Sequence, residues 1–184
     1  MKEIERKIFD IDKEAVTAKL LKMGAKIGFN GLMRVKYFDT KKGEIRKKHE
    51  LLRVRQAGDK KVEICFKSNR KVKDGCKIYD ECEFHTSDFN EVTSFFEKLG
   101  YVCTCYYEKK RTEFVLKNLK VEMDEYPRIK PFIEIEAAGA KQINNLVKEL
   151  GLEKNESTSE TINEVIKRKY PKLSLNNLIF KKGE

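Results

Sequence analysis

Three short segments of the sequence carry two glutamates separated by a single apolar or small residue. These glutamates are Glu3 and Glu5, Glu81 and Glu83, and Glu134 and Glu136. A period of two places alternate side chains on one face of a β-strand, so each segment gathers its carboxylates on one face and apolar residues on the other. Carboxylate oxygens are the ligands that magnesium and manganese prefer. The segments therefore predict strands that can hold a divalent cation.

Basic residues follow the same alternation in other segments. They are Lys7, Arg53, Arg55, Lys67, Lys109 and Arg111. A further acidic pair, Glu122 and Asp124, alternates with Val121 and Met123. The planar fork of arginine suits bidentate contacts with phosphate oxygens. A surface that carries both sets can bind a metal through its acids and a polyanion through its bases.

A single Glu-x-Glu strand usually means only that one face of an antiparallel sheet is solvated. Here same-face pairs recur in seven segments, and each segment is mostly of one sign. If the sheet closes into a barrel, these faces meet across a lumen, where unpaired charge is unfavourable. A divalent metal together with a polyanion would compensate the charges, so the pattern favours a site that binds both.

The composition limits the class of protein. A chain of 184 residues suits one substantial domain, and we expect a single domain over residues 1–184. The net charge of +10 comes mostly from lysine, and without an RNA- or DNA-binding motif we attribute it to a solvated surface rather than to a nucleic-acid partner. The sequence has no signal-peptide pattern and no apolar run of membrane-spanning length, so we expect a soluble cytoplasmic protein without a membrane partner.

Cysteine and histidine give little support for a zinc site. The five cysteines form no C-x-x-C pair, and the two histidines, His49 and His85, lie at no zinc-ligand spacing to a cysteine. We expect the cysteines to be reduced packing residues. The acidic pairs remain the candidate ligands, which favours Mg²⁺ or Mn²⁺ as the cofactor.

Periodicity predicts a chain of strands with a few helices between them. The strands are expected near residues 2–9, 33–39, 50–57, 61–68, 77–85, 101–116, 118–125 and 132–137, and the helices near 12–23, 88–99, 140–150 and 158–170. Asp12 and Asp88 are placed to cap the first two helices, and Gly24 and Gly100 to end them. A Glu-x-Glu strand followed by a helix and a long strand therefore occurs twice, which indicates an internal repeat.

The ordered motifs resemble the CYTH superfamily, the triphosphate tunnel metalloenzymes. The opening Glu3-Ile4-Glu5-Arg6-Lys7 matches the ExExK signature of that family. The match continues in the family's order through Tyr37-Phe38-Asp39, Leu52-Arg53-Val54-Arg55, Phe66-Lys67, Glu81-Cys82-Glu83, Lys109-Lys110-Arg111, Val121-Glu122-Met123-Asp124 and Phe132-Ile133-Glu134-Ile135-Glu136. It spans nearly the whole chain.

The resemblance implies an α+β fold: an eight-stranded antiparallel β-barrel, the triphosphate tunnel, with helices packed outside and a C-terminal helix. It implies metal ligands among Glu3, Glu5, Glu81, Glu83, Glu122, Asp124, Glu134 and Glu136. It implies triphosphate-binding side chains in Lys7, Arg53, Arg55, Lys67, Lys109, Arg111 and Lys169, the last from the C-terminal helix. Glu3, Glu5, Lys7 and Arg111 are the residues expected to act in catalysis.

These implications leave three functions open. The first is metal-dependent hydrolysis of a small triphosphate, namely tripolyphosphate, a nucleoside triphosphate such as ATP, or thiamine triphosphate. The second is a class IV adenylyl cyclase, which converts ATP to cyclic AMP and pyrophosphate with the same phosphate-binding groups. The third is a non-catalytic module that binds polyphosphate or RNA. The sequence also leaves open whether two chains form a homodimer.

Overall fold

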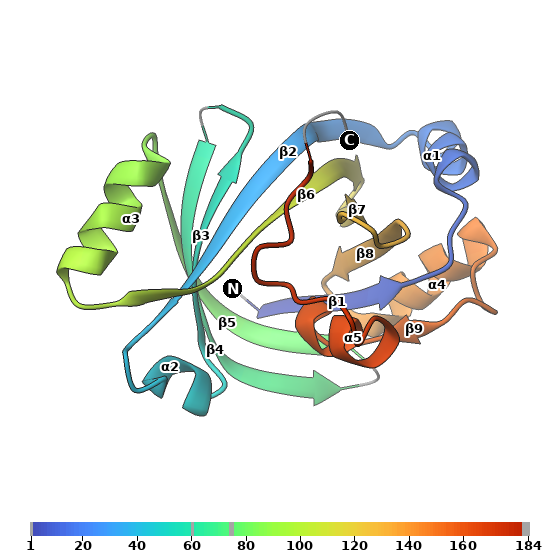
Figure 1. The fold of residues 1–184 in the computed structure, drawn as a ribbon. Coiled ribbons are helices and arrows are strands. Elements are labelled where there is room, and N and C mark those ends of the chain that lie inside the picture. Colours follow the sequence, from blue (N-terminus) through green and yellow to red (C-terminus); the bar gives the residue numbers. More distant parts are fainter. Residues whose placement is uncertain (1, 60, 74–75, 182–184) are drawn as a thin grey trace.

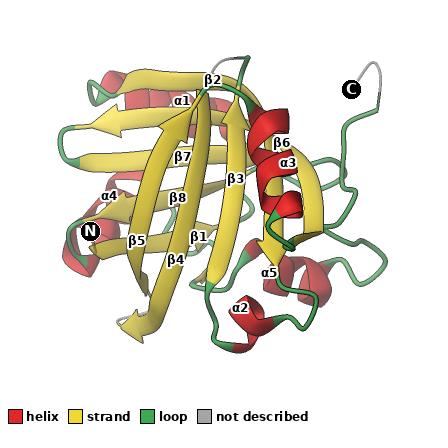
Figure 2. Cartoon of the chain, turned by 90° about the vertical axis from the view of Figure 1, so that its left-hand side faces the viewer, coloured by secondary structure: helices red, strands yellow, loops and turns green. Residues whose placement is uncertain are grey.

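The computed structural model describes residues 2–59, 61–73 and 76–181, with the side chains of residues 2, 3, 73, 76 and 77 outside the description. Long strands curve around a central space, and most helices lie outside them (Figures 1 and 2). The strands are β1 (Lys2–Ile8), β2 (Lys26–Asp39), β3 (Leu51–Ala57), β4 (Lys61–Lys73), β5 (Cys76–Thr86), β6 (Val102–Leu116), β7 (Leu119–Glu125), β8 (Phe132–Ala137) and the two-residue β9 (Ser157–Thr158). The helices are α1 (Lys13–Lys22), α2 (Glu44–Lys47), α3 (Phe89–Lys98), α4 (Ala140–Leu150) and α5 (Ile162–Lys169).

The first eight strands form a closed antiparallel barrel. They pair in the order β5-β4-β3-β2-β6-β7-β8-β1, and β1 closes the ring by pairing with β5. Strand β9 lies outside this ring and pairs with the end of β1, at Lys7 and Ile8. The eight-stranded barrel with external helices and a C-terminal helix is thus confirmed.

The two halves of the barrel share one topology. Strands β1 to β4 with α1 correspond to β5 to β8 with α3, and the corresponding strands β1 and β5 pair with each other, as do β2 and β6. The helices begin and end in the same way. Asp12 and Asp88 accept hydrogen bonds from backbone amides of the first turn, and Gly24 and Gly100 adopt left-handed φ values of +87° and +91° just past the last turn. The repeat suggested by the sequence therefore has a structural counterpart.

Two hydrophobic clusters pack helices against the outside of the barrel. One lies under α1 and α4, where Leu20 and Leu146 join outward-facing residues such as Val121 and Ile133. The other lies under α3, where Phe89 contacts a group that includes Val54. Because the apolar faces of these strands point outward, their alternate faces turn the charged residues toward the lumen.

A third cluster closes part of one barrel end. Helix α5 and the segment after it bring Ile166, Leu175 and Leu178 onto Tyr107 and Phe132. The segment also pairs with β6, since the amide of Glu108 donates to the carbonyl of Leu178 over 2.9 Å. Figure 1 shows this C-terminal segment, in red, crossing in front of the barrel opening. Hydrocarbon therefore closes part of the end of the lumen where α2 and α5 both lie (Figure 2), and charge occupies the rest.

Five elements differ from the sequence expectation. Strand β4 continues to Lys73 rather than ending near residue 68, and helix α5 begins at Ile162 rather than near residue 158. Strand β2 begins at Lys26 rather than near residue 33, because a segment with few apolar residues extends the ladder with β6. Helix α2 and strand β9 were not expected, because they are too short to show a period. No helix among the described residues combines the length and apolar character that crossing a membrane requires.

Candidate functional site

The barrel encloses a cavity of about 620 Å³ whose lining is rich in charge. Most of the residues that the sequence predicted for the site lie along it. They are Glu5, Lys7, Arg53, Arg55, Lys67, Glu81, Glu83, Lys109, Arg111, Glu122, Glu134 and Glu136. The barrel thus brings together side chains from seven strands that lie far apart in the sequence.

Two predicted residues with described side chains, Asp124 and Lys169, do not line this cavity, and the side chain of a third, Glu3, is not described. Asp124 lies behind Lys109 and Arg111, where it holds both in place. Glu3 has its backbone opposite Tyr79 in the barrel ladder, but its side chain lies outside the described part of the structure. Lys169 contacts Glu156 instead, as described below.

The wall formed by β6 and β7 is the most deeply buried part of the site. Arg111 donates two hydrogen bonds of 2.7 Å to the carboxylate of Asp124, and Lys109 donates one of 2.8 Å to the same group. The side chains of Arg111 and Asp124 are only 3% and 1% exposed. Arg111 also forms an ion pair with Glu122. These groups neutralise one another without any help from solvent, which their burial requires.

Burial changes the ionisation of this wall. Desolvation and the neighbouring charge of Arg111 lower the pKa of Lys109 to about 8, although Asp124 and Glu122 oppose the shift. Desolvation also disfavours the charged form of Arg111, but the carboxylates of Asp124 and Glu122 outweigh it and hold the pKa of Arg111 well above its usual range. Arg111 is therefore a permanent positive charge, whereas the charge on Lys109 depends on the ligand and on pH.

Carboxylates stand directly opposite one another on β1, β7 and β8. Glu5 faces Glu136 in the β1–β8 ladder, and Glu122 faces Glu134 in the β7–β8 ladder. Like charges in directly opposite positions destabilise a sheet unless cations compensate them. Lys7 forms an ion pair with Glu134 and lies 3.8 Å from Glu5. These facing oxygens are a suitable donor set for Mg²⁺ or Mn²⁺, which prefer carboxylate ligands.

Lys120 supplies a further cation to this acidic group. Its ammonium lies 2.9 Å from Glu122 and 3.0 Å from Glu136. The two carboxylates outweigh the desolvation of Lys120 and raise its pKa above the ordinary value. The sequence interpretation overlooked Lys120, although its position two residues before Glu122 places it on the same strand face.

The wall formed by β3, β4 and β5 is more accessible. Arg53 lies 2.7 Å from Glu63, and Arg55 forms a second ion pair with the same carboxylate. Burial alone would raise the pKa of Glu63, but the two arginines outweigh it and lower the pKa to about 2. The side chains of Arg53 and Arg55 are 15% and 16% exposed. They are therefore paired within the protein and still reachable from the cavity.

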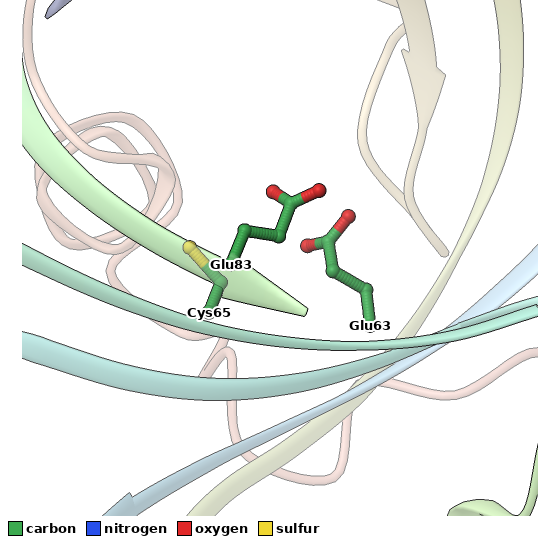
Figure 3. Close-up of side chains that lie close together, drawn as sticks. All are labelled: Glu63, Cys65 and Glu83. Atoms are coloured by element: carbon green, nitrogen blue, oxygen red, sulfur yellow. The ribbon is translucent and has the colours of Figure 1, made fainter. Parts of the chain in front are cut away.

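Glu63 is the second residue that the sequence interpretation overlooked. It shares a strand face with Lys67, four residues later, so the alternation that identified Lys67 also contained Glu63. Figure 3 shows Glu63, Cys65 and Glu83 directed into the lumen from β4 and β5. Possible ligand atoms of these three residues lie within 4.8 Å of one another.

The ionisation of Cys65 limits what this trio can bind. Desolvation raises the pKa of the Cys65 thiol to about 11, so the thiol is protonated near neutral pH. The carboxylate of Glu63 is already shared by two arginines. The trio is therefore less suited to a hard cation than the facing carboxylates of β1 and β8.

Aromatic residues separate the charged lumen from the apolar end. The hydroxyls of Tyr37 and Tyr107 lie 3.0 Å apart, and Tyr126 stacks between Tyr107 and Phe132. The ammonium of Lys109 lies 5.8 Å from the centre of the Tyr126 ring. These contacts give the cavity a rigid floor on the side of α5.

Comparison with known proteins adds evidence that the geometry alone does not give. The profile of the CYTH domain matches residues 1–166. The chain belongs to the CYTH family. A search of curated protein sequences found no significant match.

Several solved structures share the CYTH fold with this chain. A protein from Vibrio parahaemolyticus, provisionally named an adenylate cyclase, is 14% identical with a TM-score of 0.76, over 89% of this chain and 97% of its own. The PH1012 protein from Pyrococcus horikoshii OT3 is 24% identical with a TM-score of 0.68, over 84% of this chain and 94% of its own. A Hippeastrum protein, provisionally named an adenylyl cyclase and described with a dominant triphosphatase activity, is 19% identical with a TM-score of 0.67, over 91% and 95%. At these identities the likeness establishes the fold alone.

Lys169 lies beyond the segment that matches the CYTH domain. Its ammonium is 2.7 Å from Glu156 and 3.7 Å from Asp10, and it lies 4.7 Å from the centre of the Phe9 ring. It does not line the cavity. The C-terminal helix thus contributes apolar packing at the end of the lumen, while its predicted phosphate contact stays a prediction.

Proposed function

We propose that the protein hydrolyses a small triphosphate with the help of a divalent metal. The observation that carries this proposal is the pair of facing carboxylates, Glu5 and Glu136, in a lumen whose other walls present arginine and lysine. Such an arrangement suits a cation and a polyanion bound together. The triphosphatase activity described for the Hippeastrum protein is consistent with it.

The bases of the lumen would bind and orient the phosphate chain. Arg53 and Arg55 lie on one wall and Arg111 on another, so a linear triphosphate can be held from two sides. Phosphoryl transfer needs positioning and charge neutralisation more than covalent help from the protein. Displacing Glu63 from the two arginines would release their donors for phosphate oxygens. Until the substrate arrives, the carboxylate of Glu63 keeps the two arginines in place.

The acidic residues Glu5 and Glu136 would hold Mg²⁺ or Mn²⁺, with Glu134 and Glu122 beside them. The bound metal would neutralise charge on the phosphates and orient the chain. In the reaction, a water oxygen bonds to the terminal phosphorus, the bond from that phosphorus to the bridging oxygen breaks, and orthophosphate and diphosphate result. Glu83 is a suitable acceptor for the proton of the water, because it is partly exposed and directed into the lumen, whereas Asp124 is fully used by Lys109 and Arg111.

A second function is favoured by the apolar residues near α2. Ile45, Leu51 and Val102 line the end of the cavity where β3 and β6 begin. A nucleoside could pack there, so that its own 3′-hydroxyl attacks the α-phosphorus and releases pyrophosphate. This is the adenylyl cyclase alternative, and it uses the same phosphate-binding residues.

Product analysis separates the alternatives. The protein is incubated with Mg²⁺ or Mn²⁺ and with tripolyphosphate, thiamine triphosphate or ATP, and products are resolved by phosphorus NMR. Orthophosphate as the first product supports hydrolysis. Pyrophosphate with cyclic AMP from ATP would instead assign the cyclase reaction, and binding of unchanged substrates would assign a non-catalytic module.

A further inference from the structure

Three exposed cations border the cavity at the end where β2 leads into α2. Lys41, Lys42 and Arg46 line the cavity there, and each is exposed to solvent. Within the described part of the chain, none of these side chains forms an ion pair or a hydrogen bond. The bases deeper in the lumen, such as Lys109 and Arg111, are all engaged by carboxylates. These three residues are called the α2 rim.

The α2 rim is held in place by a buried carboxylate. Asp39 is only 4% exposed. It accepts hydrogen bonds from the backbone amides of Thr40, Ile45 and Arg46 over 2.7, 2.9 and 3.1 Å. Gly43, in the same turn, adopts a left-handed φ of +69°. The segment is thus a fixed border of the cavity rather than a loose loop.

The opposite end of the cavity has a different charge. The antiparallel order of the strands places the β3–β4 and β6–β7 turns there. The lining at that end includes Glu83, Glu113 and Glu136 against Lys61 and Lys120, and Lys120 is already bound to Glu136. An anion leaving the lumen at that end meets carboxylates. An anion leaving past the α2 rim, between it and the start of α5, meets three cations that have no partner among the described residues, with Glu50 as a nearby carboxylate in the lining.

We propose that the α2 rim extends the phosphate track, so that the protein takes inorganic polyphosphate chains longer than three phosphates. The inference rests on the proposed function: the terminal phosphates lie in the lumen, and the rest of the chain leaves past Lys41, Lys42 and Arg46. Water attacks the terminal phosphorus and the bridging P–O bond breaks. The products are orthophosphate and a chain that is one phosphate shorter. Lysine suits this role because it is a mobile point charge without a fixed binding geometry.

The rim favours polyphosphate over RNA. A triphosphate-ended RNA would also place its terminal phosphates in the lumen, but single-stranded bases bind by stacking on aromatic side chains. Residues 40–50, which form the segment, contain no phenylalanine, tyrosine or tryptophan. Phe38 and Tyr107 line the cavity nearby, but they are only 2% and 3% exposed. The rim itself thus offers charge without an exposed aromatic ring, which suits a chain made of phosphate alone.

The test compares two double variants of the same segment. Lys41→Ala with Lys42→Ala removes two rim charges, and Lys47→Ala with Lys48→Ala removes two exposed charges that do not line the cavity. We expect the rim variant to lower kcat/KM for long-chain polyphosphate about three- to tenfold, the size expected for two exposed ion contacts. In the rim variant, kcat/KM for tripolyphosphate should stay within about twofold of wild type. In the control variant, kcat/KM for both substrates should stay within about twofold of wild type. Equal losses on both substrates, or equal losses in both variants, would overturn the proposal.

Binding of the same phosphate chains, measured by calorimetry, tests the role of the α2 rim separately from the proposed hydrolysis. If the wild type cleaves neither substrate, hydrolysis is wrong, and the rim is then judged by affinity. A loss of affinity in the rim variant for the long chain alone supports the rim, and no loss overturns it. A loss seen only for a triphosphate-ended RNA would assign the rim to RNA and contradict the choice of polyphosphate.

Discussion

The two walls of the lumen compensate their buried charges in different ways. On β6 and β7, Arg111 and Asp124 are 3% and 1% exposed and satisfy each other. On β3, Arg53 and Arg55 are 15% and 16% exposed and share the single carboxylate of Glu63. The first wall is neutralised internally, whereas the second keeps cations that a ligand can reach.

The difference separates stability from binding. Removing one partner of a buried ion pair strongly destabilises the folded protein, because the other charge is left buried without a partner or solvent. Removing one partner of a partly exposed pair costs less stability, because water replaces the missing partner. We therefore expect the β6–β7 wall to act mainly as a frame that fixes Arg111 at the cavity, and the β3–β5 wall to supply the more accessible contacts to phosphate. Three substitutions test this division, and a fourth tests a residue outside the cavity.

The largest effect on folding is expected from Asp124→Ala. It leaves Lys109 and Arg111 buried without their common acceptor, so the free energy of unfolding should fall by about 3 to 5 kcal/mol. Chemical denaturation followed by circular dichroism measures the loss. A change below about 1 kcal/mol would show that this wall is not the frame.

On the more open wall, Arg55→Ala should affect activity more than stability. Arg53 still pairs with Glu63 in this variant, so the free energy of unfolding should change by no more than about 1 kcal/mol. Because one oriented donor to the phosphates is lost, kcat/KM for tripolyphosphate should fall about 100-fold. Steady-state assays of orthophosphate release check this. A loss of stability that matches the loss of activity would remove the contrast between the walls.

Glu63→Gln tests the contribution of the shared carboxylate through pH. The pKa of Glu63 is about 2 in the folded protein, below the value of roughly 4.3 expected in the unfolded chain. Its stabilisation is therefore complete above the unfolded pKa and is lost as the pH falls toward 2. We expect this substitution to lower the free energy of unfolding by about 2 to 3 kcal/mol at pH 7 and to flatten its dependence on acidic pH. An unchanged slope between wild type and variant would contradict the assignment.

The smallest effect is expected from Lys169→Ala. Its contacts with Glu156 and Asp10 lie outside the cavity, so tripolyphosphate turnover should stay within about twofold of wild type. A large rise in KM would instead support the sequence expectation that Lys169 binds phosphate. Kinetic titration with tripolyphosphate distinguishes the two results.

Much of the barrel was predictable because its strands alternate between the lumen and the helices. The alternation of Glu134 and Glu136 with Ile133 and Ile135 places acids inside and hydrocarbon outside, as observed. Glu63 and Lys120 were overlooked although they obey the same rule. The register that sets Glu5 opposite Glu136 was not predictable, because pairing between distant strands depends on the whole barrel. The packing of the segment after α5 was not predictable for a similar reason, since Leu175 and Leu178 belong to a segment without regular period.

The central claim is that the lumen binds a metal at its facing carboxylates and a triphosphate at its bases together. Calorimetric titration of tripolyphosphate, with and without Mg²⁺ or Mn²⁺, tests it in the wild type and in the Glu5→Gln, Glu136→Gln double variant. We predict that the metal strengthens binding by the wild type and that the variant loses this dependence while it remains folded. Binding that is equally strong with and without metal in both proteins would contradict the account.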